Sequence, residues 1–390
     1  MKIVIVTETF PPEINGVAMT FSIIAREMGR RHSVTVYRPS RPGLRNRPAA
    51  AEFGEIALPG LPIPRYPELR LGLPAGRVFR RDWRRSRPDI VHVATEGPLG
   101  ASAITAARAM KIPVTSSFHT NFHAYTRHYG LAPLRHLALA WLRRVHNRTC
   151  LTFAPTCELR DQLTAAGFRG MSVFSRGVDD SFRPLRRSEE LRRSWGAGPD
   201  DPVVLHVGRM APEKNYPLLF QVYAAMRQAA PRSLFVLVGD GPQRPRFQRE
   251  LPNGHFTGFV SRDDLARHYA SADIYIHASL TETFGNVLTE AMASGLSVAA
   301  FDYAAAREFI ADGGNGLVAA PGDSAGLTSA AVRLAVDSHL RQRLRTAAAA
   351  RMRLQSWDSV VSRFETELAN VVSGDGAASC LLREPWVQAT

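Results

Sequence analysis

Short apolar runs alternate with amphipathic stretches along almost the whole chain. In the first half, the apolar runs predict strands at Ile3–Val6, Ser33–Tyr37, Ile90–Val93, Val114–Phe118 and Leu151–Ala154. In the second half, they predict strands at Val203–Val207, Ser233–Val238, His255–Phe256, Ile274–Ile276 and Ser297–Ala300. Most of these runs are apolar at every position, which favours buried parallel sheets over half-exposed antiparallel ones.

Helical patterns fill the segments between the strands. They lie at Val17–Arg30, Gly100–Met110, Tyr216–Gln228, Arg262–Ser271 and Phe284–Ser294. Strands that alternate with helices indicate βαβ units with right-handed crossovers. The predicted fold class is therefore α/β, with two doubly wound Rossmann-like parallel-sheet domains facing across a cleft. The Pro-, Gly- and Arg-rich stretch Pro39–Pro74 predicts long loops.

The length of 390 residues suggests two domains. A polar stretch near Ser181–Pro202 marks the boundary, so we expect an N-terminal domain at residues 1–185 and a C-terminal domain at residues 186–356. Residues 357–372 predict a helix that can cross back to the N-terminal domain, and residues 373–390 predict a flexible tail.

The net charge is concentrated in the first half of the chain. The 390 residues carry 49 Lys+Arg and 35 Asp+Glu, a net charge of +14. Residues 1–180 contain 26 basic and 13 acidic residues, and residues 181–390 contain 23 and 22. The excess indicates an anionic partner for the first half: nucleic acid, a membrane surface or a phosphorylated ligand. A genome that favours Arg codons is the alternative explanation.

Membrane-spanning and secreted classes are not expected. No run of 18 apolar residues occurs, and the N-terminus leads directly into a strand without a leader peptide. We therefore expect a cytoplasmic protein. The three cysteines contain no Cys-x-x-Cys pair, so a zinc site is not expected.

Ligands of open parallel sheets bind beyond the carboxyl ends of the strands, so the loops after the strands are the candidate sites. The first loop, Thr7–Gly16, ends in Asn15-Gly16, a turn that can take positive φ and let a ligand approach the backbone. The N–H groups of the following helix would form an anion site. An ordinary βα turn is the alternative. The loop is not G-x-G-x-x-G, so a dinucleotide fingerprint is absent.

The loop Gly208–Asn215, GRMAPEKN, carries two cations directly after a strand. Arg209 and Lys214 suit a diphosphate, since Arg binds phosphate through a planar fork and Lys as a point charge. Two solvated surface charges are the alternative.

The segment ETFGNVLTE places two carboxylates, Glu282 and Glu290, about two helical turns apart. Eight helical residues rise ~12 Å, which is too far for an acid/base pair acting on one bond. The pair suits a long ligand held at two points. Phe284, Gly285 and Asn286 would begin a helix and aim N–H donors at that ligand. For Glu290, a helix-surface carboxylate is the alternative.

The segment Ser116–Tyr125 contains His119 and His123 at i and i+4. This spacing could bind a metal on a helix, but no third ligand is evident, so we expect no metal. One of the two histidines as a polar group facing a substrate is the favoured interpretation.

Together these segments resemble the glycosyltransferases of family 4, which are retaining enzymes of the GT-B fold. The resemblance covers roughly residues 1–372 and rests on four motifs in this order: GRMAPEKN, VGDGPQR, HFTGFV and ETFGNVLTEAMASGLSV. The opening TETFPPEINGVAMT also resembles the family's first loop. The chain is most similar to bacterial nucleotide-sugar-dependent hexosyltransferases that make mannosyl or glucosyl glycolipids.

The resemblance implies a role for each matching residue. Arg209 and Lys214 would hold the donor diphosphate and stabilise its leaving charge, Glu282 would contact the donor sugar, and His119 would support the reacting centre. The residues expected to bind substrate are Asn15, Gly16, Val260, Phe284, Gly285, Asn286, Val287 and Glu290. Among these, Glu290 would bind the ribose, and Val260 lies where the family's loop meets the nucleobase.

The resemblance also implies the reaction. A hexose would pass from a UDP- or GDP-linked donor to an acceptor hydroxyl with retention, and the departing phosphate oxygen would take the acceptor proton. The family needs no obligatory metal, and we expect no cofactor, because the nucleotide-sugar is a substrate.

The basic half is the presumed acceptor half. Gly76–Pro88 carries six Arg with Val, Phe and Trp interleaved, and Leu131–Arg148 predicts a basic amphipathic helix. The predicted apolar face of that helix consists of Leu134, Leu137, Ala138, Trp141, Leu142 and Val145. Such a helix is typical of membrane-surface binding, and a core-packed helix with a solvated back is the alternative.

We therefore hypothesise an acceptor in the cytoplasmic leaflet, such as diacylglycerol or a phospholipid, and peripheral attachment to the inner face of the cytoplasmic membrane. The alternatives are a soluble or polysaccharide acceptor, or a non-catalytic sugar-nucleotide-binding module. Nucleic acid is not expected, because no known nucleic-acid-binding motif accompanies the basic residues.

Overall fold

The computed structural model describes residues 1–13, 15–41, 52–63, 66–119, 135–279 and 281–374. The chain forms two compact units. Unit 1 consists of Met1–Arg176 and Trp357–Thr390, and unit 2 consists of Gly177–Ser356. The chain thus passes from unit 1 to unit 2 shortly before the stretch Ser181–Pro202, where the sequence suggested a boundary.

Unit 1 is built on a sheet that has seven strands within the described residues, and every neighbouring pair is parallel. In spatial order the strands are β3 (Gly54–Leu58), β2 (Ser33–Pro39), β1 (Lys2–Val6), β6 (Ile90–Val93), β7 (Val114–Ser117), β8 (Leu151–Ala154) and β9 (Met171–Val173). The centre of the sheet is buried, and β6 and β7 have no exposed residue. This explains why their sequences, IVHV and VTSS, contain no Asp, Glu, Lys or Arg.

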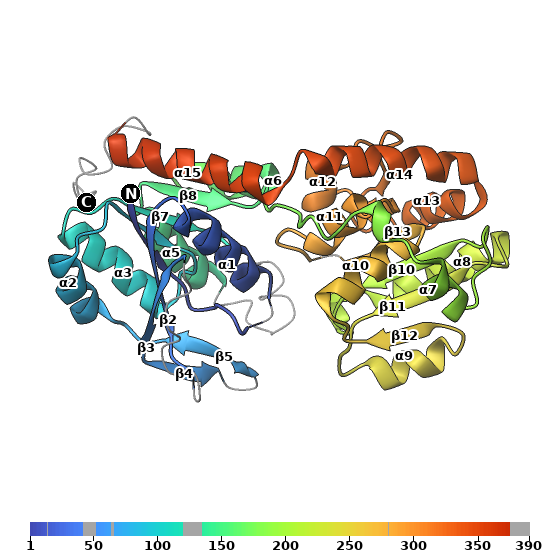
Figure 1. The fold of residues 1–390 in the computed structure, drawn as a ribbon, viewed down its shortest axis with the longest axis horizontal. Coiled ribbons are helices and arrows are strands. Elements are labelled where there is room, and N and C mark those ends of the chain that lie inside the picture. The colour runs from blue at the N-terminus through green and yellow to red at the C-terminus, as the bar shows by residue number, and fades with distance from the viewer. Residues whose placement is uncertain (14, 42–51, 64–65, 120–134, 280, 375–390) are drawn as a thin grey trace. The chain divides into compact units, whose positions relative to one another are not determined.

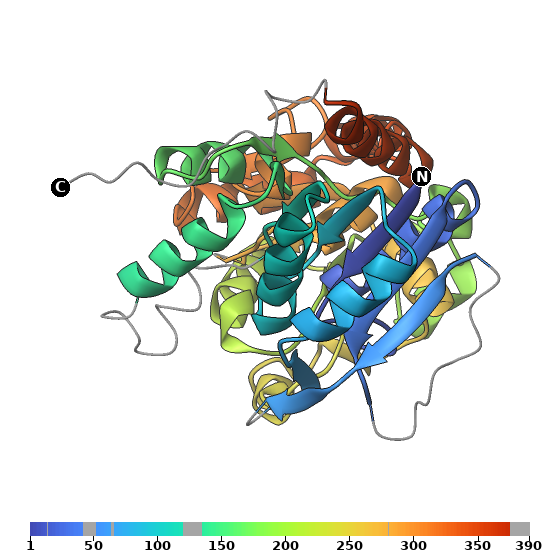
Figure 2. The ribbon, with the colours of Figure 1, turned by 90° about the vertical axis from the view of Figure 1, so that its left-hand side faces the viewer.

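Helices cover both faces of this sheet (Figures 1 and 2). They are α1 (Gly16–Gly29), α2 (Gly76–Arg85), α3 (Pro98–Ala109), α5 (Arg135–His146), α6 (Cys157–Ala165) and α15 (Trp357–Ser373). Although α15 is last in sequence, it packs along α1 in unit 1 and is drawn in red in Figure 1. Its Val361, Phe364 and Leu368 are buried in the same cluster as Ile5 and Phe21.

The stretch Pro39–Pro74 contains more regular structure than the sequence suggested. It contains β3, which extends the sheet, and a separate antiparallel hairpin of β4 (Gly60–Ile63) and β5 (Tyr66–Gly72). The expectation of long loops is therefore wrong for these residues. Proline is compatible with an edge strand, and the pairing of β4 with β5 continues past Pro62 with a register shift between Pro62 and Ile63.

Unit 2 repeats the architecture with a sheet of six strands within the described residues, again parallel throughout. In spatial order the strands are β12 (His255–Gly258), β11 (Leu234–Val238), β10 (Val203–Val207), β13 (Ile274–His277), β14 (Ser297–Phe301) and β15 (Leu317–Ala319). Its helical elements are η2 (Pro184–Arg186), α7 (Glu189–Ser194), η3 (Pro212–Lys214), α8 (Tyr216–Ala229), α9 (Arg244–Glu250), α10 (Arg262–Ser271), α11 (Asn286–Ala293), α12 (Ala305–Phe309), α13 (Ser324–Val336) and α14 (Ser338–Arg353).

The stretch Ser181–Pro202 is an ordered part of unit 2. It forms η2 and α7, and Arg192 of α7 is only 1% exposed. Its guanidinium donates hydrogen bonds to Asp273 and to the carbonyls of Gly198, Asp201 and Ser271. Both Nη atoms of this buried charge are therefore paired, and these contacts anchor the segment.

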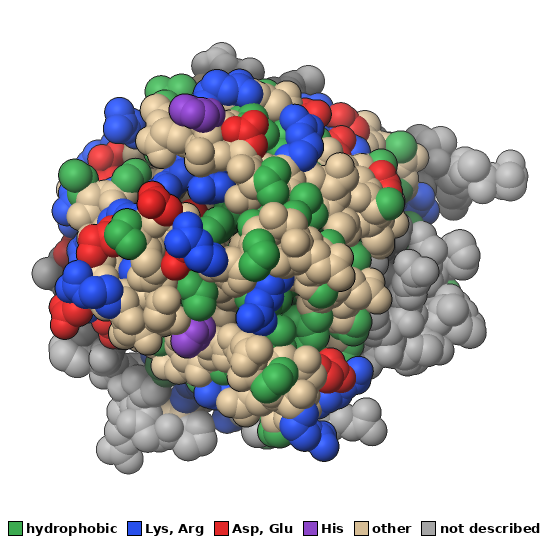
Figure 3. Space-filling model, turned by 90° about the vertical axis from the view of Figure 1, so that its right-hand side faces the viewer, with side chains coloured by type: hydrophobic (Ala, Val, Ile, Leu, Met, Phe, Trp, Pro, Cys, Tyr) green, Lys and Arg blue, Asp and Glu red, His purple; other side chains and the backbone are tan. Residues whose placement is uncertain are grey.

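The fold class predicted from the alternating pattern is confirmed, since both units are parallel α/β sheets. On the face of the molecule shown in Figure 3, basic and acidic side chains are interspersed, with no large area of one sign. No described helix is long and apolar enough to cross a membrane.

Candidate active site

An ion pair joins two loops at the carboxyl edge of the unit 2 sheet. Lys214 ends η3, in the loop after β10, and Glu282 lies in the loop after β13, the strand that pairs with β10. Lys214 Nζ donates a hydrogen bond to Glu282 Oε1. The two side chains are 17% and 14% exposed, so the pair is mostly shielded but open to a ligand on one side.

The surroundings of this pair keep it charged. Burial by itself would raise the pKa of Glu282, but the charge and hydrogen bond of the neighbouring Lys214 outweigh it, and the pKa lies below its usual value. His277 Nε2 lies 3.7 Å from Glu282 Oε1, and burial lowers the pKa of His277 to about 4. At neutral pH the site therefore contains an ammonium, a carboxylate and a neutral imidazole. Glu282 uses one of the three N–H donors of Lys214, which leaves donors for an anionic ligand.

The loop after β10 also carries the second predicted cation. Arg209 is exposed, and it lies one residue beyond Gly208, at the carboxyl end of β10. Asn215 adopts the left-handed conformation (φ 55°), and its Nδ2 donates a hydrogen bond to the carbonyl of Ala278, 3.3 Å away, in the loop after β13. Asn215 thus fixes the Lys214 loop against the Glu282 loop.

The helix α11 begins at the site, two residues later than the sequence suggested. Phe284 is buried in the core, and Gly285 at φ 100° forms the N-cap, so the helix starts at Asn286. A Cβ on Gly285 would meet nothing closer than 3.8 Å, so backbone conformation, rather than space, requires glycine. The Gly285 N-cap supplies no side-chain acceptor, and the positive end of α11 lies next to Glu282.

Glu290 is not an ordinary helix-surface carboxylate. It receives a hydrogen bond of 3.2 Å from the hydroxyl of Tyr269, which also donates to the carbonyl of Val287. Burial raises the pKa of Glu290 to about 7, although Arg262 and Tyr269 act in the opposite direction. Glu282 and Glu290 therefore have separate partners, which agrees with the expectation that they do not form an acid/base pair.

The loop after β12 presents one residue that the sequence analysis missed. Val260 is partly buried and packs against the core of unit 2. The preceding Phe259 is 84% exposed, so its aromatic ring faces solvent. Its position directly after a strand was the signal available in the sequence.

In unit 1, the first loop is organised by helix capping and not by a positive-φ turn. Asn15 is extended (φ −149°), and its Oδ1 accepts hydrogen bonds from the N–H groups of Val17 and Ala18. Gly16 is the first residue of α1 and is not among the positive-φ glycines. Our expectation of a positive-φ turn is thus wrong, because the Asn15 side chain satisfies the helix end directly.

His119 lies at the carboxyl end of β7, and its ring is 5.6 Å from the Phe21 ring of α1, in an edge-to-face arrangement. Burial lowers its pKa well below the usual value, and the nearby Arg176 adds to the effect. The imidazole is therefore neutral at physiological pH. His123 lies outside the described residues.

Glu8 is a second residue that the sequence analysis missed. It follows β1, and its Oε1 accepts a hydrogen bond of 3.0 Å from the N–H of Leu99 in the first turn of α3. Burial raises the pKa of Glu8 to about 7. Its place directly after the first strand marked it as a candidate, but only the fold shows that it meets α3.

The two basic helical segments differ from the sequence-based expectation. In α2, the aromatic residues Phe79 and Trp83 are stacked and fully buried, so only the arginine face is open to solvent. In α5, Leu142 and Val145 are buried, whereas Leu137 is 68% exposed and Trp141 is 44% exposed. The predicted single apolar face is therefore wrong: one part packs into the core and the other faces solvent.

Two family models match the chain, one for each unit. The model described as "Glycosyltransferase Family 4" matches residues 14–182, and the model described as "Glycosyl transferases group 1" matches residues 201–337. The GDP-mannose-dependent alpha-mannosyltransferase of Mycobacterium tuberculosis (strain CDC 1551 / Oshkosh) is 34% identical over 365 residues, which are 92% of this chain and 94% of that protein. The chain belongs to the family 4 glycosyltransferases.

Further similarities of this family 4 glycosyltransferase extend across both units. The alpha-monoglucosyldiacylglycerol synthase of Acholeplasma laidlawii is 27% identical over 81% of this chain and 84% of that protein. The crystal structure of Anabaena HepE in complex with UDP superimposes with a TM-score of 0.76 at 20% identity, over 95% of this chain and all of that one. The family resemblance inferred from the motifs is thereby confirmed.

The candidate residues of the glycosyltransferase lie in loops that follow the carboxyl ends of strands or in the first turns of the helices after those loops. Unit 2 contributes Arg209, Lys214, Val260, Glu282, Phe284, Gly285, Asn286, Val287 and Glu290. Unit 1 contributes Asn15, Gly16 and His119. Contacts within unit 2 bring Lys214, Glu282 and the start of α11 together. Glu290 lies about one turn further along α11. The individual roles of these residues stay predictions.

Proposed function

We propose that the protein is a retaining, metal-independent hexosyltransferase that moves a hexose from a UDP- or GDP-linked donor to a hydroxyl of a membrane lipid, such as diacylglycerol or a phospholipid. The observation that carries the proposal is the Lys214–Glu282 pair beside the start of α11. Unit 2 binds the donor in this proposal, and unit 1 binds the acceptor.

The charge arrangement in unit 2 suits a nucleoside-diphosphate leaving group. Lys214 keeps free N–H donors, Arg209 supplies a second cation, and the positive end of α11 adds a partial charge. Positive groups fixed before the reaction stabilise the charge that develops as the sugar–phosphate bond breaks. In this proposal they take the place of a metal ion. Glu282, held by Lys214, accepts hydrogen bonds from the sugar hydroxyls.

The expected chemistry follows from this charge pattern. The bond between the sugar's anomeric carbon and the β-phosphate oxygen breaks, and the acceptor oxygen bonds to the same face of that carbon. The departing phosphate oxygen takes the acceptor's proton, so no protein nucleophile is required. The neutral imidazole of His119 would act as a polar group beside the hexose.

The lipid acceptor is supported by an exposed patch on α5, which we define as Leu137, Trp141 and Arg144. These residues have spacings of i, i+4 and i+7, so they lie on one side of the helix. Arg108 and Arg144 both lie close to Arg148, and their repulsion adds to the burial that lowers the pKa of Arg148. An exposed Leu and Trp next to several arginines are the features of a helix that binds an anionic membrane surface.

The names of two relatives support a nucleotide-sugar donor and a lipid acceptor. One relative is named for a GDP-mannose donor and another for a diacylglycerol product. The excess of basic residues lies in the first half of the chain and fits an anionic surface for unit 1. The proposed donor site does not account for this excess, because its cations Arg209 and Lys214 belong to unit 2.

A donor panel tests the proposal directly. Purified protein receives radiolabelled UDP-glucose, UDP-galactose or GDP-mannose together with a total lipid extract, and thin-layer chromatography separates the products. We expect a labelled glycolipid from one donor, formed equally with and without EDTA, and NMR should show the anomeric configuration of the donor. Labelled product in the aqueous phase alone would favour a soluble or polysaccharide acceptor. Neither product nor donor hydrolysis would favour a non-catalytic module.

Vesicle flotation tests the membrane part separately. The wild-type protein should float with phosphatidylcholine vesicles that contain phosphatidylglycerol, and high salt should weaken this binding. Leu137→Ser with Trp141→Ser should abolish it. Leu185→Ser is the matched control, because Leu185 is 88% exposed but belongs to unit 2. Equal flotation of the α5 variant and the wild type would contradict the proposal.

A further inference from the structure

Unit 2 contains a cavity of about 770 Å³ at the edge of its sheet opposite to the Lys214–Glu282 pair. It is lined by the residues that lead into β10, β11 and β13, by the end of α13, and by the first two turns of α14. Lys214 lies beyond the other end of β10, and five residues of strand span ~16 Å. The cavity is therefore separate from the candidate active site.

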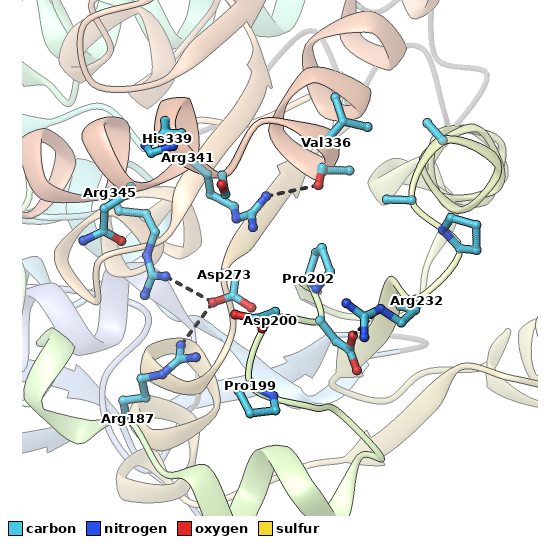
Figure 4. Close-up of a pocket in the computed structure, with 17 residues that line it drawn as sticks. Arg187, Pro199, Asp200, Pro202, Arg232, Asp273, Val336, His339, Arg341 and Arg345 are labelled. Atoms are coloured by element: carbon cyan, nitrogen blue, oxygen red, sulfur yellow. Dashed lines mark hydrogen bonds and ion pairs between the residues drawn. The ribbon is translucent and has the colours of Figure 1, made fainter.

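Arginines converge on the base of this cavity. The carboxylate of Asp273, directly before β13, accepts hydrogen bonds from three arginines. The donors are Nη1 of Arg187 at 3.1 Å, Nη1 of Arg345 at 3.1 Å and Nη1 of the buried Arg192 at 2.8 Å. Figure 4 shows Arg187 and Arg345 reaching Asp273 from different elements, while Arg341 extends from α14 toward the same space. Glu189 also pairs with Arg187 at 2.8 Å, so two carboxylates meet three guanidinium groups at this end of the cavity.

The remaining cations of the cavity are only partly satisfied. Arg341 Nη1 donates to the carbonyls of Leu334 and Ala335, and within the described residues its Nε and Nη2 have no hydrogen-bond acceptor. Burial lowers the pKa of both Arg341 and Arg345 in spite of Asp273, and the neighbouring arginines add to this effect. A second negative charge in the cavity would relieve this unfavourable electrostatic energy.

The acidic residues of the cavity do not supply that charge. Asp201 is paired with Arg232 at 3.0 Å on the far wall. Asp200 is exposed at the rim. Four arginines and three aspartates line the cavity, and two of those three aspartates are already occupied by arginines.

We infer that this cavity binds a small phosphorylated metabolite, with its phosphate held by Arg341, Arg345 and Arg187. Guanidinium groups bind phosphate oxygens in pairs, and this geometry favours phosphate over a monovalent anion. The volume lies within the range of ~300–1,000 Å³ of small-molecule sites and exceeds what a phosphate ion alone fills. The ligand class is therefore a phosphate monoester with a polar organic part, which the exposed Asp200 meets as a hydrogen-bond acceptor.

Titration calorimetry with the full-length protein tests this inference. The probes are glucose 6-phosphate, inorganic phosphate and glucose. We expect one molecule of glucose 6-phosphate to bind, with an affinity that falls as salt rises, and with weaker or no heat from the other two. Tighter binding of inorganic phosphate than of glucose 6-phosphate, or binding of glucose, would overturn the assigned ligand class.

Variants locate the binding. Arg341→Gln should weaken the affinity by about tenfold or more, because it removes a charge-assisted contact. Arg343→Gln is the matched control: it is exposed on the same helix, lies outside the cavity, and should bind as the wild type does. Lys214→Ala should also bind normally, which separates this site from the donor site.

Arg341 also contacts the end of α13, so Arg341→Gln could lose stability. Arg187→Gln gives an independent answer, because Arg187 is 28% exposed and Asp273 keeps Arg192 and Arg345. It should weaken binding by several-fold. Unchanged affinity in a folded Arg341→Gln or Arg187→Gln protein, or an equal loss in Arg343→Gln, would overturn the inference.

Discussion

Replacement of Lys214 by alanine is the most direct test of the catalytic site. The substitution removes an ammonium group that is 17% exposed and leaves the Glu282 carboxylate beside His277 alone. Without Lys214, burial is no longer outweighed, so the pKa of Glu282 should rise. The variant therefore changes the charge of the site in two ways. It removes a cation, and it makes the carboxylate of Glu282 easier to protonate.

The magnitude follows from the position of the group. A fixed donor to a developing negative charge typically contributes ~10²–10³ in kcat. Lys214 shares its charge with Glu282 and is partly solvated, so we expect a loss above about tenfold, which corresponds to ~1.4 kcal/mol in the barrier. The free energy of unfolding should fall by ~1–3 kcal/mol, because the mostly shielded Glu282 carboxylate loses its hydrogen-bond donor.

The assay measures kcat at saturating donor together with the thermal unfolding midpoint. Lys2→Ala is the matched control, because Lys2 is an exposed lysine of β1 far from unit 2 in sequence. Glu282→Gln should also reduce turnover, and the double variant should lose less than the sum of the two single losses, since the side chains act as a pair. If Lys214→Ala kept near-normal turnover, the assignment of the donor site would be refuted.

Three further predictions concern stability. Glu290→Gln should flatten the pH dependence of the free energy of unfolding, measured with urea between about pH 5 and pH 8. The pKa of Glu290 is raised from 4.5 to about 7 in the folded protein, so the wild type loses stability as the pH rises through this interval. An unchanged slope would contradict this prediction. Gly285→Ala should lower the free energy of unfolding by ~1–2 kcal/mol through backbone strain at φ 100°, measured by chemical denaturation, and Gly76→Ala, in an open position, is its control. Phe364→Ala should lower the free energy of unfolding by ~3–5 kcal/mol. In calorimetry the unfolding transition of unit 1 should shift and that of unit 2 should not, because Phe364 is buried in the unit 1 core. A shift of both transitions would count against the division into units.

The sequence predicted several buried strands well, because a strand that is covered on both faces is mostly apolar. Ile90–Val93, Leu151–Ala154 and Val203–Val207 agree with the observed strands residue for residue. It failed for Gly54–Leu58 and the hairpin that follows, since edge strands contain the same Gly and Pro residues that mark loops. The polar stretch Ser181–Pro202 suggested a domain boundary, and the fold adds that its Arg192 is buried by partners more than 70 residues away.

By itself, the sequence determined the two-sheet α/β class, the loops that carry the candidate residues and the family. These properties depend on local periodicity and on short contiguous motifs, so the sequence alone predicts them. Only the tertiary structure decided that Lys214 meets Glu282, that Phe79 and Trp83 are core while Trp141 is exposed, and that four arginines line a cavity at the opposite edge of the unit 2 sheet. Each of these depends on pairing, burial or charge contributed by segments distant in sequence, which the three-dimensional fold alone brings together.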